Sequence, residues 1–224
     1  MKNNETLQRE VQDAIKWEPL LHAAEIGVIV KNGVVTLTGT VDSYMKKVEA
    51  EVATKNIAGV KAVVENIKIV SNSAWAKKTD EDIANEVLTA YKWNVEVPND
   101  KIHVKVENGK VTLDGDVSWN YQKEAAEHAI KSLSGVMGVI NNIHIKSSTQ
   151  DSVEKAAIEK ALASNWALNN GDITVHVNHN KVTLVGMVNS WYQKNEAGKI
   201  AWKAPGVTNV ENDLLVEFEY SLIS

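Results

Sequence analysis

The chain has 224 residues, with 24 basic and 29 acidic side chains and a formal net charge of −5 at pH 7. It has no cysteine, which excludes disulfides, thiolate metal sites and cysteine nucleophiles. Arg9 is the only arginine, and a chain without a basic stripe is not expected to bind nucleic acid. No apolar run is long enough for a transmembrane segment or a signal core.

The chain opens with a predicted helix, because Leu7, Val11 and Ile15 have the spacing of one helical face. Similar helical patterns return at Ile83, Val87, Leu88 and Tyr91, and at Val153, Ala157, Ala161 and Leu162. A tryptophan follows each pattern. We expect Trp17, Trp93 and Trp166 to be core residues that end the helix.

A predicted β-hairpin follows each helix. Alternating apolar residues in the first strand indicate one buried face, and they are Ile26, Val28 and Val30, then Ile102, Val104 and Val106, then Ile173, Val175 and Val177. Asn32-Gly33 and Asn108-Gly109 are strong hairpin-turn signals. His179-Asn180 stands at the third turn, where Asn180 can adopt the left-handed conformation of the glycine it replaces.

The second strand of the hairpin carries the clearest repeat. Gly33-Val-Val-Thr-Leu-Thr-Gly39 returns as Gly109-Lys-Val-Thr-Leu-Asp-Gly115 and as Asn180-Lys-Val-Thr-Leu-Val-Gly186. We expect Gly39, Gly115 and Gly186 to end the strand with positive φ or a close backbone approach.

A second helix with a small apolar face is predicted from near Ser43, Trp119 and Trp191. We expect Gly59, Gly135 and Gly206 to cap its C-terminus. An apolar strand follows, and the helical connection favours a parallel pairing with the strand before it.

The predicted fold is therefore α+β, with three tandem αββαβ modules over residues 1–72, 77–147 and 149–219. Each module has a three-stranded mixed sheet with two helices over one face. The other face is expected to be polar, and Trp75 in the first linker is expected to pack against a neighbour.

The sequence favours no catalytic, cofactor or metal site. His176 and His179 are the only close histidine pair, and two ligands are too few for a zinc site. The glycines form neither a phosphate-binding loop nor a nucleophile elbow, and no polar cluster of the kind an active site needs stands out. We predict a protein that is not an enzyme and has no cofactor.

Aromatic residues beside lysines mark the start of the second helix in two modules. These residues are Trp119, Tyr121 and Lys123 in the second module and Trp191, Tyr192 and Lys194 in the third. Exposed rings at a helix N-terminus suit a phospholipid headgroup, while buried ones would serve as a hydrophobic staple or a contact between modules. Both interpretations remain open, and the partner is either phospholipid or another protein.

The glycine-bounded strand, the helix of small residues and the Gly-Val dipeptides at 59, 135 and 206 resemble the BON domain of OsmY-type bacterial proteins. The resemblance implies an αββαβ module without catalysis, and phospholipid binding or scaffolding in osmotic or envelope stress. The alternative is a cytoplasmic potassium-type ion sensor or a purely structural protein-interaction module. A native start at Met1 would place the protein in the cytoplasm, and removal of a signal peptide would place it in the periplasm.

Overall fold

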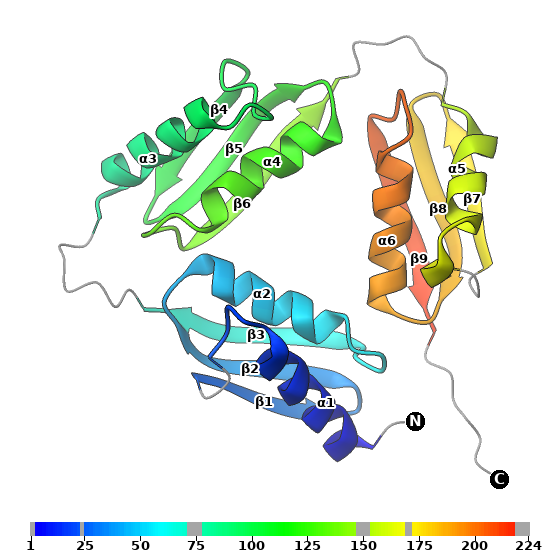
Figure 1. The fold of residues 1–224 in the computed structure, drawn as a ribbon, viewed down its shortest axis with the longest axis horizontal. Helices are drawn as coiled ribbons and strands as arrows, with labels where there is room; N and C mark the ends of the chain where they lie inside the picture. The colour runs from blue at the N-terminus through cyan, green and yellow to red at the C-terminus, as the bar shows by residue number, and fades with distance from the viewer. Residues whose placement is uncertain (1–2, 23–24, 71–77, 147–152, 169–171, 218–224) are drawn as a thin grey trace. The chain divides into compact units, whose positions relative to one another are not determined.

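The computed structural model describes residues 3–22, 25–70, 78–146, 153–168 and 172–217, so Trp75 lies outside the described residues. Each of three modules has a three-stranded sheet, and two helices lie over one face of that sheet (Figure 1). The predicted α+β class and αββαβ order are confirmed.

The strands and the second helix have closely similar lengths in the three modules, while the first helix has 14 residues in the first two modules and 9 in the third. The first module contains α1 (Asn4–Trp17), β1 (Ile26–Lys31), β2 (Val34–Val41), α2 (Tyr44–Lys55) and β3 (Ala62–Ile69). The second contains α3 (Asp80–Trp93), β4 (Ile102–Glu107), β5 (Lys110–Val117), α4 (Asn120–Lys131) and β6 (Gly138–Ile145). The third contains α5 (Lys155–Ala163), a short 3-10 helix (Trp166–Leu168), β7 (Asp172–Asn178), β8 (Lys181–Val188), α6 (Trp191–Trp202) and β9 (Asn209–Val216).

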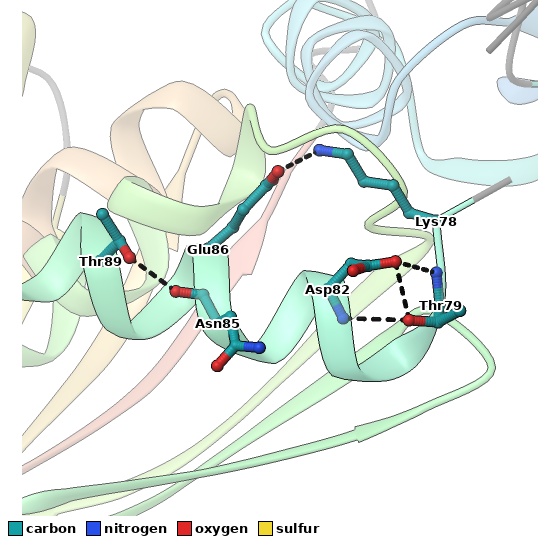
Figure 2. Close-up of polar contacts among 6 residues, drawn as sticks. All are labelled: Lys78, Thr79, Asp82, Asn85, Glu86 and Thr89. Atoms are coloured by element: carbon teal, nitrogen blue, oxygen red, sulfur yellow. Dashed lines mark hydrogen bonds and ion pairs between the residues drawn. The ribbon is translucent and has the colours of Figure 1, made fainter. Parts of the chain in front are cut away.

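The first helix begins at a side-chain cap in the first two modules, whereas the N-cap residue of α5, Glu154, makes no side-chain hydrogen bond to the helix. In α3, the Thr79 hydroxyl accepts a hydrogen bond from the Asp82 N–H at 3.1 Å, and the Asp82 carboxylate accepts one from the Thr79 N–H at 2.9 Å (Figure 2). This reciprocal pairing satisfies two N–H groups that a helix start leaves unpaired. In α1, the Asn3 side chain accepts one hydrogen bond from the Thr6 N–H.

The second strand of each module lies at the centre of its sheet, and the strand orders are β1-β2-β3, β4-β5-β6 and β7-β8-β9. The first two strands pair antiparallel, and the third pairs parallel with the second in the two modules that contain β5·β6 and β8·β9. The buried face carries the predicted apolar residues. In the second module the core includes Ile83, Val87, Tyr91, Val111, Leu113, Ala126, Ile130 and Ile143.

The hairpin turns need positive φ at their first residue. Asn32, Asn108 and His179 have φ values of 53°, 52° and 53°. Asn180 is not among the positive-φ residues, so the prediction that it takes over the left-handed conformation of glycine was wrong. Its side chain instead donates to the Gly206 carbonyl at 2.5 Å, which ties the hairpin turn to the turn before β9.

The closing glycines lie inside the second strand and do not end it, because β2, β5 and β8 continue for two more residues. Gly39, Gly115 and Gly186 have φ values of 131°, 143° and 139°. A Cβ on these residues would lie 2.0, 2.1 and 1.7 Å from a carbonyl oxygen of the residue that precedes or begins the first strand. The two strands therefore approach more closely here than any side chain permits.

The second set of glycines does not cap the helix as predicted. Gly59, Gly135 and Gly206 stand four residues after the last helical residue, with φ values of 103°, 90° and 80°. The N–H of each following valine donates to a carbonyl three residues earlier, as in Val207 to Ala204. This places glycine third in a four-residue turn, the position at which a type II turn needs positive φ.

The face of each sheet that the helices leave open is less polar than predicted. Exposed apolar side chains lie on it at Ile29 and Val64, at Ile140, and at Val185, Met187 and Leu215. Three of these six belong to the third module.

Candidate functional site

The start of α4 carries the aromatic corner predicted for the second module. Gln122 accepts hydrogen bonds from the N–H groups of Ser118 and Trp119, at 3.0 and 3.1 Å, and so fixes the backbone where β5 enters α4. Trp119 is 38% exposed and Tyr121 is 52% exposed. Lys123 is half-buried one turn into the helix. The corner thus presents an indole and a phenol to solvent at the positive end of a helix.

The corresponding corner of the third module is more closed. Lys194 donates to the Leu214 carbonyl at 2.7 Å, and its ammonium lies 5.6 Å from the centroid of the Trp191 ring. Trp191 is half-buried and Tyr192 is 39% exposed. The lysine therefore helps to hold α6 on β9.

The tryptophans of the two corners are not equivalent positions, contrary to the predicted recurrence. The helices α4 and α6 begin at Asn120 and Trp191, so Trp191 corresponds to Asn120 and Trp119 corresponds to Ser190. Tyr121 and Lys123 do correspond to Tyr192 and Lys194, and the first module has Met45 and Lys47 in these places. Lys47 donates to the Ile67 carbonyl at 3.1 Å, as Lys194 does to Leu214. The lysine recurs in all three modules and the tyrosine in two, while the tryptophan is an addition at a different place in each corner.

The prediction that the helix-end tryptophans are core residues was wrong. Trp17, Trp93 and Trp166 are 88%, 81% and 81% exposed. Trp17 and Trp93 are the last residues of α1 and α3, and Trp166 begins the 3-10 helix. The exposure of Trp17 could have been inferred from the sequence, because Trp17 follows the buried Ile15 by two residues. Two helical residues turn through about 200°, which points the indole away from the core.

The histidine pair lies on a strand and its turn. His176 is exposed on β7, and the His179 ring lies with Nδ1 2.7 Å from Asn178 Oδ1. Among the described residues, no group of three or more His, Asp or Glu side chains is positioned to hold a metal ion.

The buried Tyr91 and the half-buried Glu127 have shifted pKa values, and both have structural partners. Burial, with a smaller effect from Glu127, raises the pKa of Tyr91, whose hydroxyl donates to the Ala126 carbonyl at 3.0 Å. Burial opposes ionisation of Glu127, but hydrogen bonds from Lys131 and Asn141 outweigh it and lower the pKa. Asn141 also donates to the Lys123 carbonyl at 3.1 Å, so these groups join α4 to β6.

No helix within the described parts of the chain is both long and apolar enough to cross a bilayer.

Comparison with known proteins finds a bacterial relative. The chain is 25% identical over 147 residues to osmotically-inducible protein Y of Escherichia coli strain K12, a match that covers 64% of this chain and 73% of the relative.

Solved structures resemble the chain only loosely as a whole. A structure of CdsD, a structural protein of the type III secretion system of Chlamydia trachomatis, is 16% identical with a TM-score of 0.24, and covers 96% of this chain and 94% of that one. The C-terminal domain of CdsD is 17% identical with a TM-score of 0.25, and covers 96% of this chain and 100% of that one.

The family comparison agrees with the repeat seen in sequence and fold. The model of the BON domain matches residues 3–71, 79–147 and 150–217. Each match contains one of the three-stranded sheets with its two helices. The chain belongs to the BON-domain family and contains three copies of the domain.

Proposed function

We propose that this protein is a non-catalytic, OsmY-like binding protein of osmotic or envelope stress, and that it binds phospholipid surfaces weakly through the corner at Trp119 and Tyr121. The name of the Escherichia coli relative supports the osmotic setting. The observation that carries the lipid proposal is the exposure of both rings at the N-terminus of α4.

The physical basis is the amphipathic character of the two side chains. Indole and phenol rings are favoured at a membrane interface, where one end is apolar and the other is wet. The positive end of the α4 dipole would favour a headgroup phosphate beside them. Burial of each ring would contribute on the order of 1–3 kcal/mol, which is enough for weak and reversible attachment.

Co-sedimentation with phosphatidylcholine vesicles tests the lipid proposal. We expect the wild type to sediment with vesicles, and the double variant Trp119→Ala, Tyr121→Ala to lose most of this binding. Met45→Ala is the matched control, because Met45 takes the place of Tyr121 in the first module. Equal binding by wild type and double variant, or binding by neither, would contradict the proposal.

A scaffolding role is the second candidate, and the open sheet face of the third module favours it. Met187 and Leu215 are register partners on β8 and β9 and are 46% and 68% exposed, with Val185 nearby at 42%. Neighbouring exposed apolar side chains of this kind are typical of protein contacts.

Affinity capture from an envelope extract tests the scaffolding candidate. The bait would be the wild type or Leu215→Lys, and the second candidate predicts a protein that the wild type retains and the variant loses. Identical retained proteins would count against it. Fractionation of cells that express the native gene tests the envelope location.

A further inference from the structure

A groove of about 610 Å³ lies in the first module between α1 and α2. The side chains that matter to its chemistry are Glu10, Asp13, Ala14, Trp17, Ala53 and Ile57. Small residues from both helices leave the space open, and the Trp17 indole forms an aromatic wall. Its volume is within the range of small-molecule sites in proteins.

The electrostatic environment of this groove is negative. It lies at the C-terminal ends of both helices, since α1 ends at Trp17 and α2 ends at Lys55. Helix C-termini carry a partial negative charge, and Asp13 stands one turn before Trp17 on the same wall. The Lys55 ammonium is already 2.5 Å from the Glu51 carboxylate, and Lys16 does not line the groove.

An exposed indole in a negative field is suited to a cation. The Trp17 ring is 88% exposed, so its face is accessible. An ammonium over the face of a tryptophan is attracted by the ring quadrupole, and the apolar remainder of such a molecule would cover Ala14 and Ala53. We propose that this groove binds a small molecule that joins an ammonium group to an apolar body.

The other two modules lack the carboxylate that Asp13 provides. In the second module, Thr89 replaces Asp13 and donates to the Asn85 carbonyl at 2.8 Å (Figure 2). In the third module, Lys160 takes the place of Asp13. Trp93 and Trp166 are as exposed as Trp17 but have no carboxylate in the place of Asp13, so they act as internal controls.

Titration of the full chain with decyltrimethylammonium below its micelle concentration, followed by NMR, tests the site. Decyl sulfate and decyl maltoside are matched probes with the same tail. We expect saturable binding of the ammonium that shifts resonances of the first module, with decyl sulfate bound at least about tenfold more weakly. Trp17→Ala and Asp13→Lys should each weaken ammonium binding about fivefold or more, while Trp93→Ala should change it less than about twofold.

Several outcomes would overturn the site. They are no saturable binding of decyltrimethylammonium, equal binding of decyl sulfate, unchanged binding in Trp17→Ala, or an equal loss in Trp93→Ala. Asp13 and Trp17 are both exposed, so the variants are expected to fold, and circular dichroism checks this. The site is independent of the lipid proposal, because the probe carries no phosphate and the groove lies in a different module.

Discussion

At the scale of single residues, the three modules share backbone geometry as well as a pattern of side chains. Gly39, Gly115 and Gly186 allow two strands to approach where a Cβ would collide with a carbonyl oxygen. Positive φ at the same residues adds a conformational cost for any other residue type. These two constraints explain why the pattern keeps glycine at one position in all three modules.

Replacement of Gly115 by valine is expected to destabilise the second module by about 1–3 kcal/mol or more, from strained backbone and the clash with Lys101. Gly138→Ala is the control, because its Cβ would meet only the Lys110 side chain at 3.8 Å. Hydrogen exchange of peptides from β4 and β5 measures the effect within the intact chain. Unchanged protection in Gly115→Val would show that the strands can relax around a side chain.

Because of Tyr91, the stability of the second module is expected to depend on pH. The other two modules should not share this dependence, because Ile15 and Leu162 fill the equivalent places. Burial raises its pKa in the folded state above the ordinary value of 10.0. The stability from the neutral hydroxyl is therefore fully present below about pH 10 and is lost as the pH rises toward the folded-state pKa.

The free energy of unfolding of the wild type should exceed that of Tyr91→Phe by about 0.5–1.5 kcal/mol near neutral pH. This difference should shrink above about pH 10. Denaturant unfolding of both proteins from pH 7 to 11 measures this difference, with the exchange of α3 amides as the probe of the second module. A difference that stays constant or grows with pH would contradict the assigned environment of the hydroxyl.

At the scale of elements, the first helix fixes the hairpin turn in the first two modules. The Asp80 carboxylate at the start of α3 accepts hydrogen bonds from the N–H groups of Asn108 and Gly109, both at 2.8 Å. In the first module Asn4 accepts from the Asn32 N–H at 3.0 Å. In the second module this link joins residues that are 28 and 29 positions apart in the sequence. It orients the helix over the sheet.

Asp80→Ala should destabilise the second module by about 1–3 kcal/mol, because two turn N–H groups lose a charged acceptor. Asp80→Asn should retain part of the stability, since Asn4 performs this role with an amide. The exposed neighbour Glu81→Ala serves as the control. Faster exchange of the Asn108 amide in Asp80→Ala, measured by NMR, is the expected signature, and equal exchange in all three variants would refute the link.

The elements could be predicted because their signals are local. Alternation in β1 and Asn32-Gly33 define a hairpin within a dozen residues, and the structure places them in that register. The link from Asp80 to Asn108 could not be predicted, since its partners are far apart in sequence. The exposure of Trp17 could have been predicted from helical periodicity. Trp17 was expected in the core because tryptophan is often buried, and its position on the helix was given less weight. Pro205-Gly206 likewise carried the signal of a type II turn.

The candidate site was less predictable than the fold. The aromatic corners follow from sequence, but the sequence does not show that Lys194 is committed to the Leu214 carbonyl. The 71-residue spacing of Gly115 and Gly186 does place Trp119 opposite Ser190, so the mismatch of Trp119 and Trp191 could have been read from the sequence. Side-chain partners depend on packing across the module, and no local pattern encodes them.

At the scale of the whole molecule, one fold is used three times with different surfaces. The first module carries the negative groove, the second the aromatic corner of α4, and the third the apolar sheet face. The net charge of −5 gives no general attraction to anionic membranes.

Lipid binding should therefore depend little on salt. Screening changes steeply between low salt and about 0.15 M, where the Debye length is about 8 Å. We expect vesicle co-sedimentation to vary less than about twofold over this range, and binding to phosphatidylglycerol vesicles should not exceed that to phosphatidylcholine. A steep fall with salt would indicate electrostatic capture in place of ring insertion.

Hydrogen–deuterium exchange of the full chain, with and without phosphatidylcholine vesicles, tests the central claim most directly. The account predicts protection of the peptide that spans residues 118–124, and no comparable change in the equivalent residues 42–48 of the first module. Protection confined to other surfaces, or none at vesicle concentrations that sediment the protein, would contradict the assignment of function to this corner.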